Sequence, residues 1–327
     1  MIRVALFGCG VMGTRIAQAL LDRPSVKIAA AVDLNPALAG KDLGEVMQAK
    51  PLGVKIGPSL DFNAVDAIIH ATTSRFEDVA RQISPALEAG LDVVSTCEEL
   101  SYPWKRHPEL SKRIDDLAKR CGATVVGTGI NPGYLMDTLP LTLTAPCLRV
   151  DGLHVTRMMN SSKRRIPFQK KIGTGMSVEE FRKKIDAGEI TGHVGLLESI
   201  HMIAGGLGWT LDKAVELPPQ PVIAQKETPS GMGPVAAGKV LGLKSEAYAE
   251  RGGRRAITLT FVAHAEAPDE YDEVVVEGEP NLRQRILGGV HGDTGTVAMV
   301  VNTLPLAVAA PPGLLTMKDL PVPRCAR

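Results

Sequence analysis

Aromatic side chains are scarce in this chain, and so is an excess of charge of either sign. Phe, Trp and Tyr make up 4% of the 327 residues, and 37 basic side chains stand against 36 acidic ones, for a net charge of +1. Nucleic-acid binding favours a basic excess, and base-stacking surfaces need aromatic rings. The composition therefore argues against a nucleic-acid partner.

Cysteine pairs are also missing. The five cysteines are scattered, and no CxxC pair or Cys/His zinc spacing occurs among them: Cys9, Cys97, Cys121, Cys147 and Cys325. Disulfide frameworks and structural zinc sites depend on such spacings. We therefore expect free thiols, no metal site and a reducing, intracellular environment.

Long apolar runs are absent as well. The most apolar stretches, such as 138–148 and 296–310, are too short for a membrane span or are broken by proline and polar residues. The first residues, MIRVALFGCG, begin a strand at once and leave no room for a signal peptide. We expect a soluble cytoplasmic protein that has no membrane partner.

Short apolar runs alternate with helical patterns over the first 150 residues. The predicted strands are 2–8, 26–33, 65–73, 91–97 and 123–129, and the predicted helices between them are 11–22, 76–90 and 107–122. Continuous rather than alternating apolar strands are typical of a parallel sheet that is covered on both faces. The pattern predicts an α/β domain over residues 1–150, with a doubly wound parallel Rossmann sheet.

The first strand is followed by GCGVMG, a GxGxxG motif at the start of a helix. In this context Gly8 permits the tight turn, Gly10 lets a pyrophosphate approach the backbone, and Gly13 lets helix and strand pack closely. Val11 and Met12 begin the helix, whose free N–H groups favour an anion. A glycine turn without a ligand is the alternative, and the motif alone is weak evidence.

Asp33 strengthens the motif, because it ends the next strand about 20 residues further on, where an acid that binds the ribose is expected. A carboxylate accepts hydrogen bonds from a free 2′-hydroxyl and repels a 2′-phosphate, so Asp33 favours NAD over NADP. Lys41 lies downstream and could relieve that repulsion, which leaves use of both cofactors open.

Three strand ends are expected to face one crevice, because ligands of doubly wound sheets bind outside the carboxyl ends of the strands. The segments 70–74, 95–100 and 127–133 are these ends. The residues predicted to contact the cofactor there are Ala71, Thr72, Thr73, Thr96, Cys97, Asn131, Pro132 and Gly133.

Two adjacent carboxylates, Glu98 and Glu99, end the second of these segments. Charged residues near helix starts are common, so a cap for the turn before Ser101 is one explanation. A group that transfers protons is the other, because a carboxylate at the crevice can take a proton from a reacting nitrogen. The position at the strand end favours a catalytic role for at least one of the two.

The pattern changes near residue 151. Long alternating strands begin at Gly152, Arg254 and Asp272, with helices predicted at 177–188, 193–208 and 211–216. Alternation is typical of a sheet with one solvated face, so we predict an α+β domain over 151–292 with a mostly antiparallel sheet. An apolar helix at 293–310, with a cap at Asp293 and Thr294, is expected to pack back on the first domain.

The second domain is expected to supply the substrate pocket. The basic, glycine-ended segment 160–176 would reach over the cofactor, although a solvated loop is equally compatible with its charge. His193 is more often a cap or core residue than a catalyst. The candidate pocket residues are Tyr134, Leu135, Met136, Phe168, Thr174, Met176 and His193.

Several segments together resemble one family over nearly the whole chain. They are FGCGVMGTRIAQALL (7–21), STCEELSYPW (95–104), GTGINPGYLMDTLP (127–140), SKRRIPFQKKIGTGM (162–176), GHVGLLES (192–199) and HGDTGTVAMVVNTLP (291–305). They resemble the 2,4-diaminopentanoate dehydrogenases and the native amine dehydrogenases related to them, which are similar in fold to dihydrodipicolinate reductase.

The resemblance implies an NAD(P)-dependent enzyme that deaminates a small primary amine oxidatively, or aminates a ketone or aldehyde with ammonia in reverse. It also implies a pocket glutamate, which maps onto the Glu98–Glu99 pair, and a homodimer formed through the second-domain sheet. We favour Glu98 as the catalytic acid because it comes first off the strand end, where Glu99 could cap the next turn.

Other functions remain open at this point. A true 2,4-diaminopentanoate dehydrogenase should need a cation for the substrate carboxylate, and the candidates are Arg157, Lys163, Arg164 and Arg165. A dihydrodipicolinate reductase is less compatible, because its His-His motif has no counterpart here. A non-catalytic NAD(P)-binding sensor would keep the glycines and need no acid at the strand end.

Overall fold

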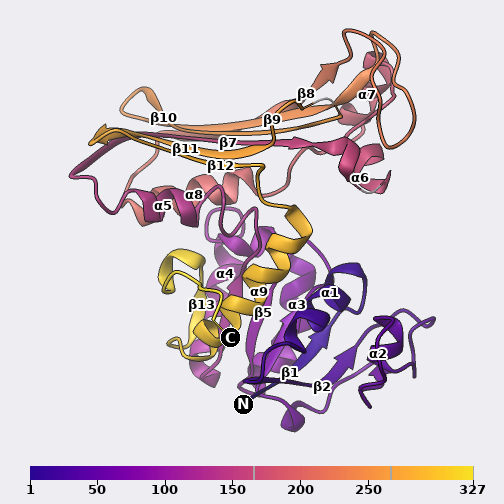
Figure 1. Ribbon diagram of the computed structural model, residues 1–327. Helices are drawn as coiled ribbons and strands as arrows, with labels where there is room; N and C mark the ends of the chain where they lie inside the picture. Colours follow the sequence, from indigo (N-terminus) through magenta and orange to yellow (C-terminus); the bar gives the residue numbers. More distant parts are fainter. Residues whose placement is uncertain (165, 266, 327) are drawn as a thin grey trace. The chain divides into compact units, whose positions relative to one another are not determined.

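The chain folds into two compact units (Figure 1). The structure, a computed structural model, describes residues 1–164, 166–265 and 267–326. The first unit comprises Met1–Tyr134 and His291–Arg327, and the second comprises Leu135–Val290. The chain thus leaves the first unit once and returns once. Its first crossing lies before residue 150 because helix α5 (Thr138–Leu143) packs within the second unit, against α8.

A parallel sheet forms the centre of the first unit. Its seven strands in the described residues are ordered β13-β6-β5-β4-β1-β2-β3, and every neighbouring pair is parallel. The order runs outward from β1 in both directions, which is the doubly wound arrangement. The strands are β1 (Ile2–Phe7), β2 (Val26–Val32), β3 (Ile56–Gly57), β4 (Ala67–His70), β5 (Asp92–Ser95), β6 (Thr124–Gly127) and β13 (Gly313–Leu315).

Helices pack on this sheet, where α3 lies beside α4 and α1 beside α9 (Figure 1). Strands β4 and β6 are buried along their whole length, as continuous apolar runs require. The predicted Rossmann class is therefore confirmed. The helices are α1 (Val11–Leu20), α2 (Leu43–Val46), η1 (Phe62–Ala64), α3 (Phe76–Glu88), η2 (Glu99–Ser101), α4 (Pro108–Cys121), α9 (Gly292–Val308) and η4 (Met317–Asp319).

In the part of the chain that the structure describes, the second unit is built on a six-stranded sheet of order β12-β11-β7-β10-β9-β8. Strands β7 and β10 pair in parallel, and the other pairs are antiparallel. Buried and half-buried residues alternate along β7, because helices cover one face of the sheet. The strands are β7 (Arg149–Asn160), β8 (Lys213–Ile223), β9 (Val240–Arg251), β10 (Arg254–His264), β11 (Tyr271–Glu279) and β12 (Leu282–Leu287).

Short helices complete the second unit. They are α5, η3 (Ser161–Lys163), α6 (Ile166–Lys171), α7 (Val178–Asp186) and α8 (Leu196–Gly206). The Ser177 hydroxyl accepts a hydrogen bond from the Glu180 N–H and caps α7, as the sequence predicts. In the described part of the chain, no helix combines the length and the apolar character that a membrane crossing requires.

Two local predictions are wrong. Residues 211–216 were expected to be helical, but Lys213 begins strand β8, which pairs with β9. The prolines at 218 and 219 exclude a continuing helix and suit an edge strand, where the register shifts. The cap of α9 is His291 rather than Asp293, and Asp293 pairs with Arg15 of α1 in the same unit.

Asp92, at the start of β5, carries a carboxyl group that folding leaves with few partners. Its Oδ1 accepts a hydrogen bond from the Thr124 N–H of β6 at 2.8 Å. Burial raises the pKa of the Asp92 carboxyl to about 6, and the bonds from Thr124 oppose that rise only in part. The ionised side chain is therefore a source of instability at neutral pH.

We expect Asp92→Asn to remove a pH dependence of stability. Because folding raises this pKa, the contribution of Asp92 is fully present below about pH 4 and is lost as the pH rises through about 6. Asparagine keeps an oxygen for Thr124 but does not ionise. The variant should gain about 1 kcal/mol over the wild type between about pH 4 and pH 7.5, with solvent screening allowed for. Urea unfolding across that range measures the difference, and a constant difference would contradict the explanation.

Candidate functional site

The glycine loop after β1 is shaped by close backbone contacts. Gly8 has a φ of +94°, and a Cβ there would lie 2.5 Å from the carbonyl oxygen of Ala71. A Cβ on Gly13 would lie 1.8 Å from the carbonyl oxygen of Gly8. A Cβ on Gly10 would meet no atom within 4 Å. Gly8 and Gly13 are thus required by the fold, whereas the space beside Gly10 is open to a ligand.

The N-terminus of α1 is left ready for an anion. Its N-cap, Gly10, offers no side-chain hydrogen bond, and its first turn has no acidic residue. Val11 is 57% exposed, and Met12 beside it is half-buried. Free N–H groups and the positive end of the helix dipole favour a phosphate at such a position. These features fit the pyrophosphate of a dinucleotide.

Asp33 follows β2 and supports the same loop. Its Oδ2 accepts a hydrogen bond from the Cys9 N–H at 2.7 Å, and its Oδ1 accepts one from the Asn35 N–H at 2.8 Å. Burial, followed by the Asp33 charge, raises the pKa of the Cys9 thiol to about 12, so this cysteine stays protonated. Each Asp33 oxygen retains a lone pair for a further donor.

A cavity of about 280 Å³ opens at the ends of β1 and β2. It is lined by Phe7, Gly8, Val32, Asp33, Leu34, Pro58, Thr72 and Gln82. Gly8, Asp33 and Thr72 were predicted to contact a cofactor. Pro58 follows β3, a two-residue strand that was not predicted, and Gln82 lies within α3, so neither a glycine motif nor a predicted strand end marks them in the sequence.

The end of β4 is bonded to the neighbouring strand ends. The Ala71 N–H donates to the Phe7 carbonyl of β1 at 2.7 Å, and the Thr96 N–H donates to the His70 carbonyl at 2.9 Å. The Thr73 hydroxyl accepts a hydrogen bond from the Arg75 N–H at 3.3 Å, just before α3. These residues therefore lie together at one edge of the sheet.

Cys97 fixes the turn after β5 from the inside. Its side chain is buried, and its thiol donates to the Ser74 carbonyl at 3.1 Å. Burial is the main cause that raises the pKa of this thiol to about 12, and the nearby charges of Glu98 and Glu99 add to it. Cys97 therefore anchors the turn as a neutral thiol and is not a nucleophile.

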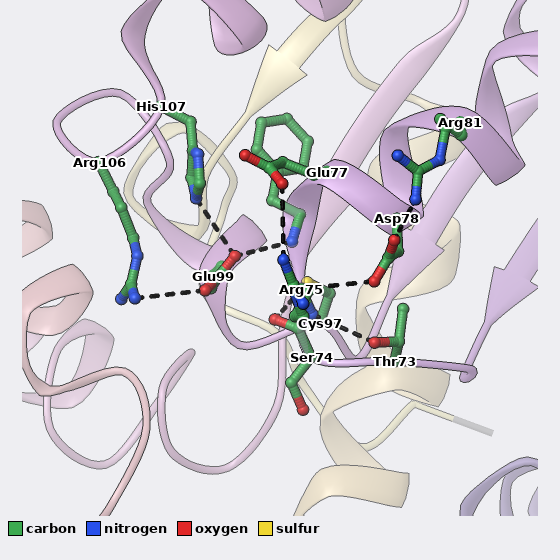
Figure 2. A network of polar contacts seen from close by, with 11 residues as sticks. Thr73, Ser74, Arg75, Glu77, Asp78, Arg81, Cys97, Glu99, Arg106 and His107 are labelled. Atoms are coloured by element: carbon green, nitrogen blue, oxygen red, sulfur yellow. Dashed lines mark hydrogen bonds and ion pairs between the residues drawn. The ribbon is translucent and has the colours of Figure 1, made fainter. Parts of the chain in front are cut away.

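Both carboxylate oxygens of Glu99 contact other residues of the first unit (Figure 2). Its Oε2 accepts a hydrogen bond from the Phe76 N–H at the start of α3 (2.8 Å) and lies 3.2 Å from His107 Nε2 at the start of α4. Its Oε1 lies 3.4 Å from Arg106 Nη2. The carboxylate thus joins the N-terminal ends of two helices, where negative charge is favourable.

Glu98 differs from its neighbour. Its backbone carbonyl accepts hydrogen bonds from the N–H and hydroxyl of Ser101, which fix the turn. Its half-buried carboxylate has no hydrogen bond or ion pair within residues 1–164, 166–265 and 267–326. Of the two predicted acids, Glu98 is therefore the one that remains available for chemistry.

The turn after β6 is compact. The Thr128 N–H donates to the Ser95 carbonyl of β5 at 2.8 Å, and the Ile130 N–H donates to the Thr296 hydroxyl of α9 at 3.3 Å. Gly133 has a φ of +124°, and a Cβ there would lie 2.5 Å from the amide nitrogen of Gly129. The Asn131–Pro132 peptide bond between them is cis. The loop predicted to contact the cofactor is thus held against β5 and α9.

The predicted pocket residues are spread over both units. Tyr134 ends the first part of the first unit, whereas Leu135 and Met136 begin the second unit and are fully buried. Phe168 and Met176 pack against an apolar cluster that includes Met159, Ile172, Phe181, Ile190, Leu243 and Phe261.

The two polar members of the predicted pocket are tied to the second sheet. The Thr174 hydroxyl donates to the Leu241 carbonyl at 3.2 Å. The His193 ring stacks on Phe261 with 4.6 Å between centroids, and the backbone N–H of His193 donates to the Ser245 hydroxyl at 3.2 Å. His193 lies before α8 rather than in its first turn. These residues gather on the helix-covered face of the sheet.

Arg157 lies on the same face, on β7 next to Phe261 of β10. Its Nε is 3.6 Å from Asp272 Oδ1, and its Nη2 donates to the Val290 carbonyl at 2.6 Å. Burial lowers the pKa of Arg157 and raises that of Asp272, so desolvation outweighs their attraction. Its Nη1 has no hydrogen-bond partner among the described residues.

The other predicted cations offer less support for a site that binds a substrate carboxylate. The Arg164 guanidinium lies over the Phe168 ring, 5.2 Å from its centroid. Arg165 and the side chain of Lys163 lie outside the described residues. Among these predicted cations, Arg157 is therefore the one whose surroundings favour binding of a substrate carboxylate.

Comparison with known proteins gives the family. The 2,4-diaminopentanoate dehydrogenase C-terminal domain model matches residues 134–327, and the dihydrodipicolinate reductase N-terminus model matches residues 2–97. A 2,4-diaminopentanoate dehydrogenase from Acetoanaerobium sticklandii is 35% identical over 99% of this chain and 94% of its own length.

Two amine dehydrogenases are also similar. One from Streptomyces virginiae is 24% identical over 98% of this chain and 97% of its own length. The solved structure of one from Mycobacterium smegmatis has a TM-score of 0.83 and 28% identity, over 99% of this chain and 97% of that one. The predicted resemblance is thereby confirmed: the chain belongs to the 2,4-diaminopentanoate dehydrogenase family.

Proposed function

We propose that the chain is an NAD(P)-dependent amine dehydrogenase in which Glu98 moves the protons. A primary ammonium, NAD(P)⁺ and water give a carbonyl compound, ammonium, NAD(P)H and a proton, and the reverse reaction aminates the carbonyl. Membership of the family supports an oxidoreductase that acts on amines. The assignment of Glu98 rests on the different contacts that the two adjacent carboxylates make.

The carboxylates of Glu99 and Glu98 differ in their bonding partners. Glu99 accepts the Phe76 N–H and lies against His107 and Arg106, so its charge is already compensated. Glu98 stands on the same turn with its backbone fixed by Ser101 and its carboxylate without a partner among the described residues. A general base needs a fixed position and free lone pairs, and Glu98 has both.

The chemistry requires such a base. A hydride leaves the carbon of an amine only when the nitrogen has a lone pair, and an alkylamine is protonated at neutral pH. The Glu98 carboxylate would take that proton, release it to solvent and, ionised again, stabilise the positive charge of the iminium that forms. It would next accept a proton from the water that attacks the iminium and pass it to the departing nitrogen. In reductive amination the same group returns these protons.

The cofactor residues proposed are those of the first unit. The loop at Gly8 and Gly10 and the N-terminus of α1 would hold the pyrophosphate. The Asp33 carboxylate would accept hydrogen bonds from the ribose hydroxyls. The bound nicotinamide would accept the hydride. The Asp33 charge disfavours a 2′-phosphate, which supports a preference for NAD.

The first test is ammonia-dependent oxidation of NADH, and of NADPH, with a small panel of ketones and aldehydes at mildly alkaline pH. We expect turnover that requires ammonia, with NADH the better cofactor. Glu98→Gln should lower kcat about 100- to 10,000-fold, because it removes the proton-transfer group and keeps the shape of the side chain.

Glu99→Gln is the matched control. Its amide oxygen still accepts the Phe76 N–H, so activity should stay within a few fold while thermal stability falls with the loss of the ion pairs. Ammonia-independent or absent turnover in the wild type would refute the proposed function. Equal activity of Glu98→Gln and the wild type would refute the proposed role of Glu98 but not the proposed function.

A second candidate concerns the substrate. A carboxylate-bearing amine, of the 2,4-diaminopentanoate class, is favoured by Arg157, whose buried Nη1 has no acceptor among the described residues. A buried guanidinium N–H pair is costly without an acceptor, and a carboxylate is its natural partner. The 35% identical relative is a 2,4-diaminopentanoate dehydrogenase, which agrees with this class.

Arg157→Met tests this candidate. The value of kcat/KM for 2-amino-4-oxopentanoate should fall about 10- to 100-fold, because a charged hydrogen bond is lost, while that for pentan-2-one should change little. The variant leaves Asp272 buried without a cation, so Arg157→Met/Asp272→Met serves as a control for folding. Equal losses on both carbonyl substrates in the double variant would exclude a carboxylate-binding role.

We also propose a homodimer formed through the face of the second sheet that α5 and α8 leave uncovered. That face presents half-buried side chains from adjacent strands, including Thr156, Met158, Thr258 and Thr260. Such a face suits two-fold pairing, in which the same patch of both copies meets. Light scattering should give the mass of a dimer for the wild type and of a monomer for Thr260→Arg. A wild-type monomer would contradict the proposal.

A further inference from the structure

A chain of hydrogen bonds runs from the cavity at the end of β1 to the turn that carries Glu98. Gln82 Oε1 lies 2.7 Å from His70 Nε2 and 2.6 Å from Thr72 Oγ1. His70 Nδ1 lies 3.1 Å from Ser95 Oγ, which accepts the Cys97 N–H at 3.1 Å. His70 and Ser95 are fully buried, whereas Thr72 and Gln82 line the cavity.

The hydroxyl hydrogens determine the direction of this chain. The Ser95 hydroxyl has His70 Nδ1 as its acceptor, and the Thr72 hydroxyl has Gln82 Oε1. His70 then carries its proton on Nε2 and donates it to Gln82 Oε1. If the Gln82 amide were reversed, His70 would donate to Ser95 and the Ser95 hydroxyl hydrogen would lose its acceptor, whereas the Thr72 hydroxyl could still donate to His70 Nε2 at 3.0 Å. Burial lowers the pKa of His70, which agrees with a neutral ring.

This arrangement fixes what Gln82 presents to the cavity. Its oxygen is occupied by two donors, so its amide nitrogen Nε2 is the group that remains for a ligand. The cavity walls also include Val32, Leu34 and Pro58, and Leu34 is 80% exposed. A large exposed apolar side chain beside a cavity is accounted for when a flat apolar ligand covers it.

We propose that Gln82 recognises the adenine of the dinucleotide, by donating a hydrogen bond from Nε2 to a ring nitrogen of the base. This inference rests on the proposed NAD(P) dependence and extends it to a residue on α3. Asp33 takes the ribose hydroxyls, so the base lies beyond them, between Leu34, Pro58 and Gln82. Adenine N1, N3 and N7 are acceptors, and Gln82 offers a donor.

The test is the binding of ADP-ribose, followed by calorimetry, and of NADH, followed by fluorescence. Gln82→Met keeps the length of the side chain and removes its hydrogen bonds, and it should raise both dissociation constants about fivefold. Arg81→Met, on the exposed side of the same helix, is the matched control and should change neither. At saturating NADH, kcat of Arg81→Met should equal that of the wild type.

Dinucleotides in which adenine N1, N3 or N7 is replaced by CH identify the contact. One of the three should bind the wild type about fivefold more weakly and Gln82→Met no more weakly than NADH does. Unchanged affinity in Gln82→Met, or no loss with any of the three analogues, would overturn the inference. Failure of the wild type to bind NADH at all would instead refute the proposed function.

Discussion

The hydrogen bond that Glu99 accepts from the Phe76 N–H at the start of α3 is the interaction on which the candidate site depends. The same carboxylate meets His107 at the start of α4, so one side chain joins the end of β5 to both helices of that face. A cap of this kind contributes about 1 kcal/mol, and the helix dipole adds to it. Its larger effect is geometric, because the turn it fixes is the one on which Glu98 stands.

Much of the first unit could be predicted from the sequence, because it follows from short-range patterns. Continuous apolar runs indicate strands buried on both faces, and β4 and β6 are such strands. In the first loop, a Cβ on Gly8 or Gly13 would collide with backbone atoms, whereas the space beside Gly10 is open. The GxGxxG motif predicts both features. The cap of α7 at Ser177 is equally local.

The rest depended on partners that are distant in the sequence. Glu98 and Glu99 are indistinguishable as letters, and the Phe76 N–H that separates their roles lies 23 residues earlier. Gln82 reaches its cavity only because α3 packs on the sheet beside β5, where Gln82 bonds to His70 at the end of β4, and no spacing of residue types reveals this. Residues 211–216 have helix-forming side chains, yet pairing with β9 makes the last four of them a strand, as tertiary contacts often override propensity.

The two crossings of the chain have a consequence for biosynthesis. Strand β13 pairs with β6, and α9 packs on α1, yet both follow the whole second unit in the sequence. On the ribosome the first unit therefore lacks an edge strand and one covering helix until the last residues emerge. A nascent parallel sheet with an open edge exposes apolar surface, which makes the interval before His291 is synthesised the period of greatest exposure to aggregation. The second unit, by contrast, is complete before release.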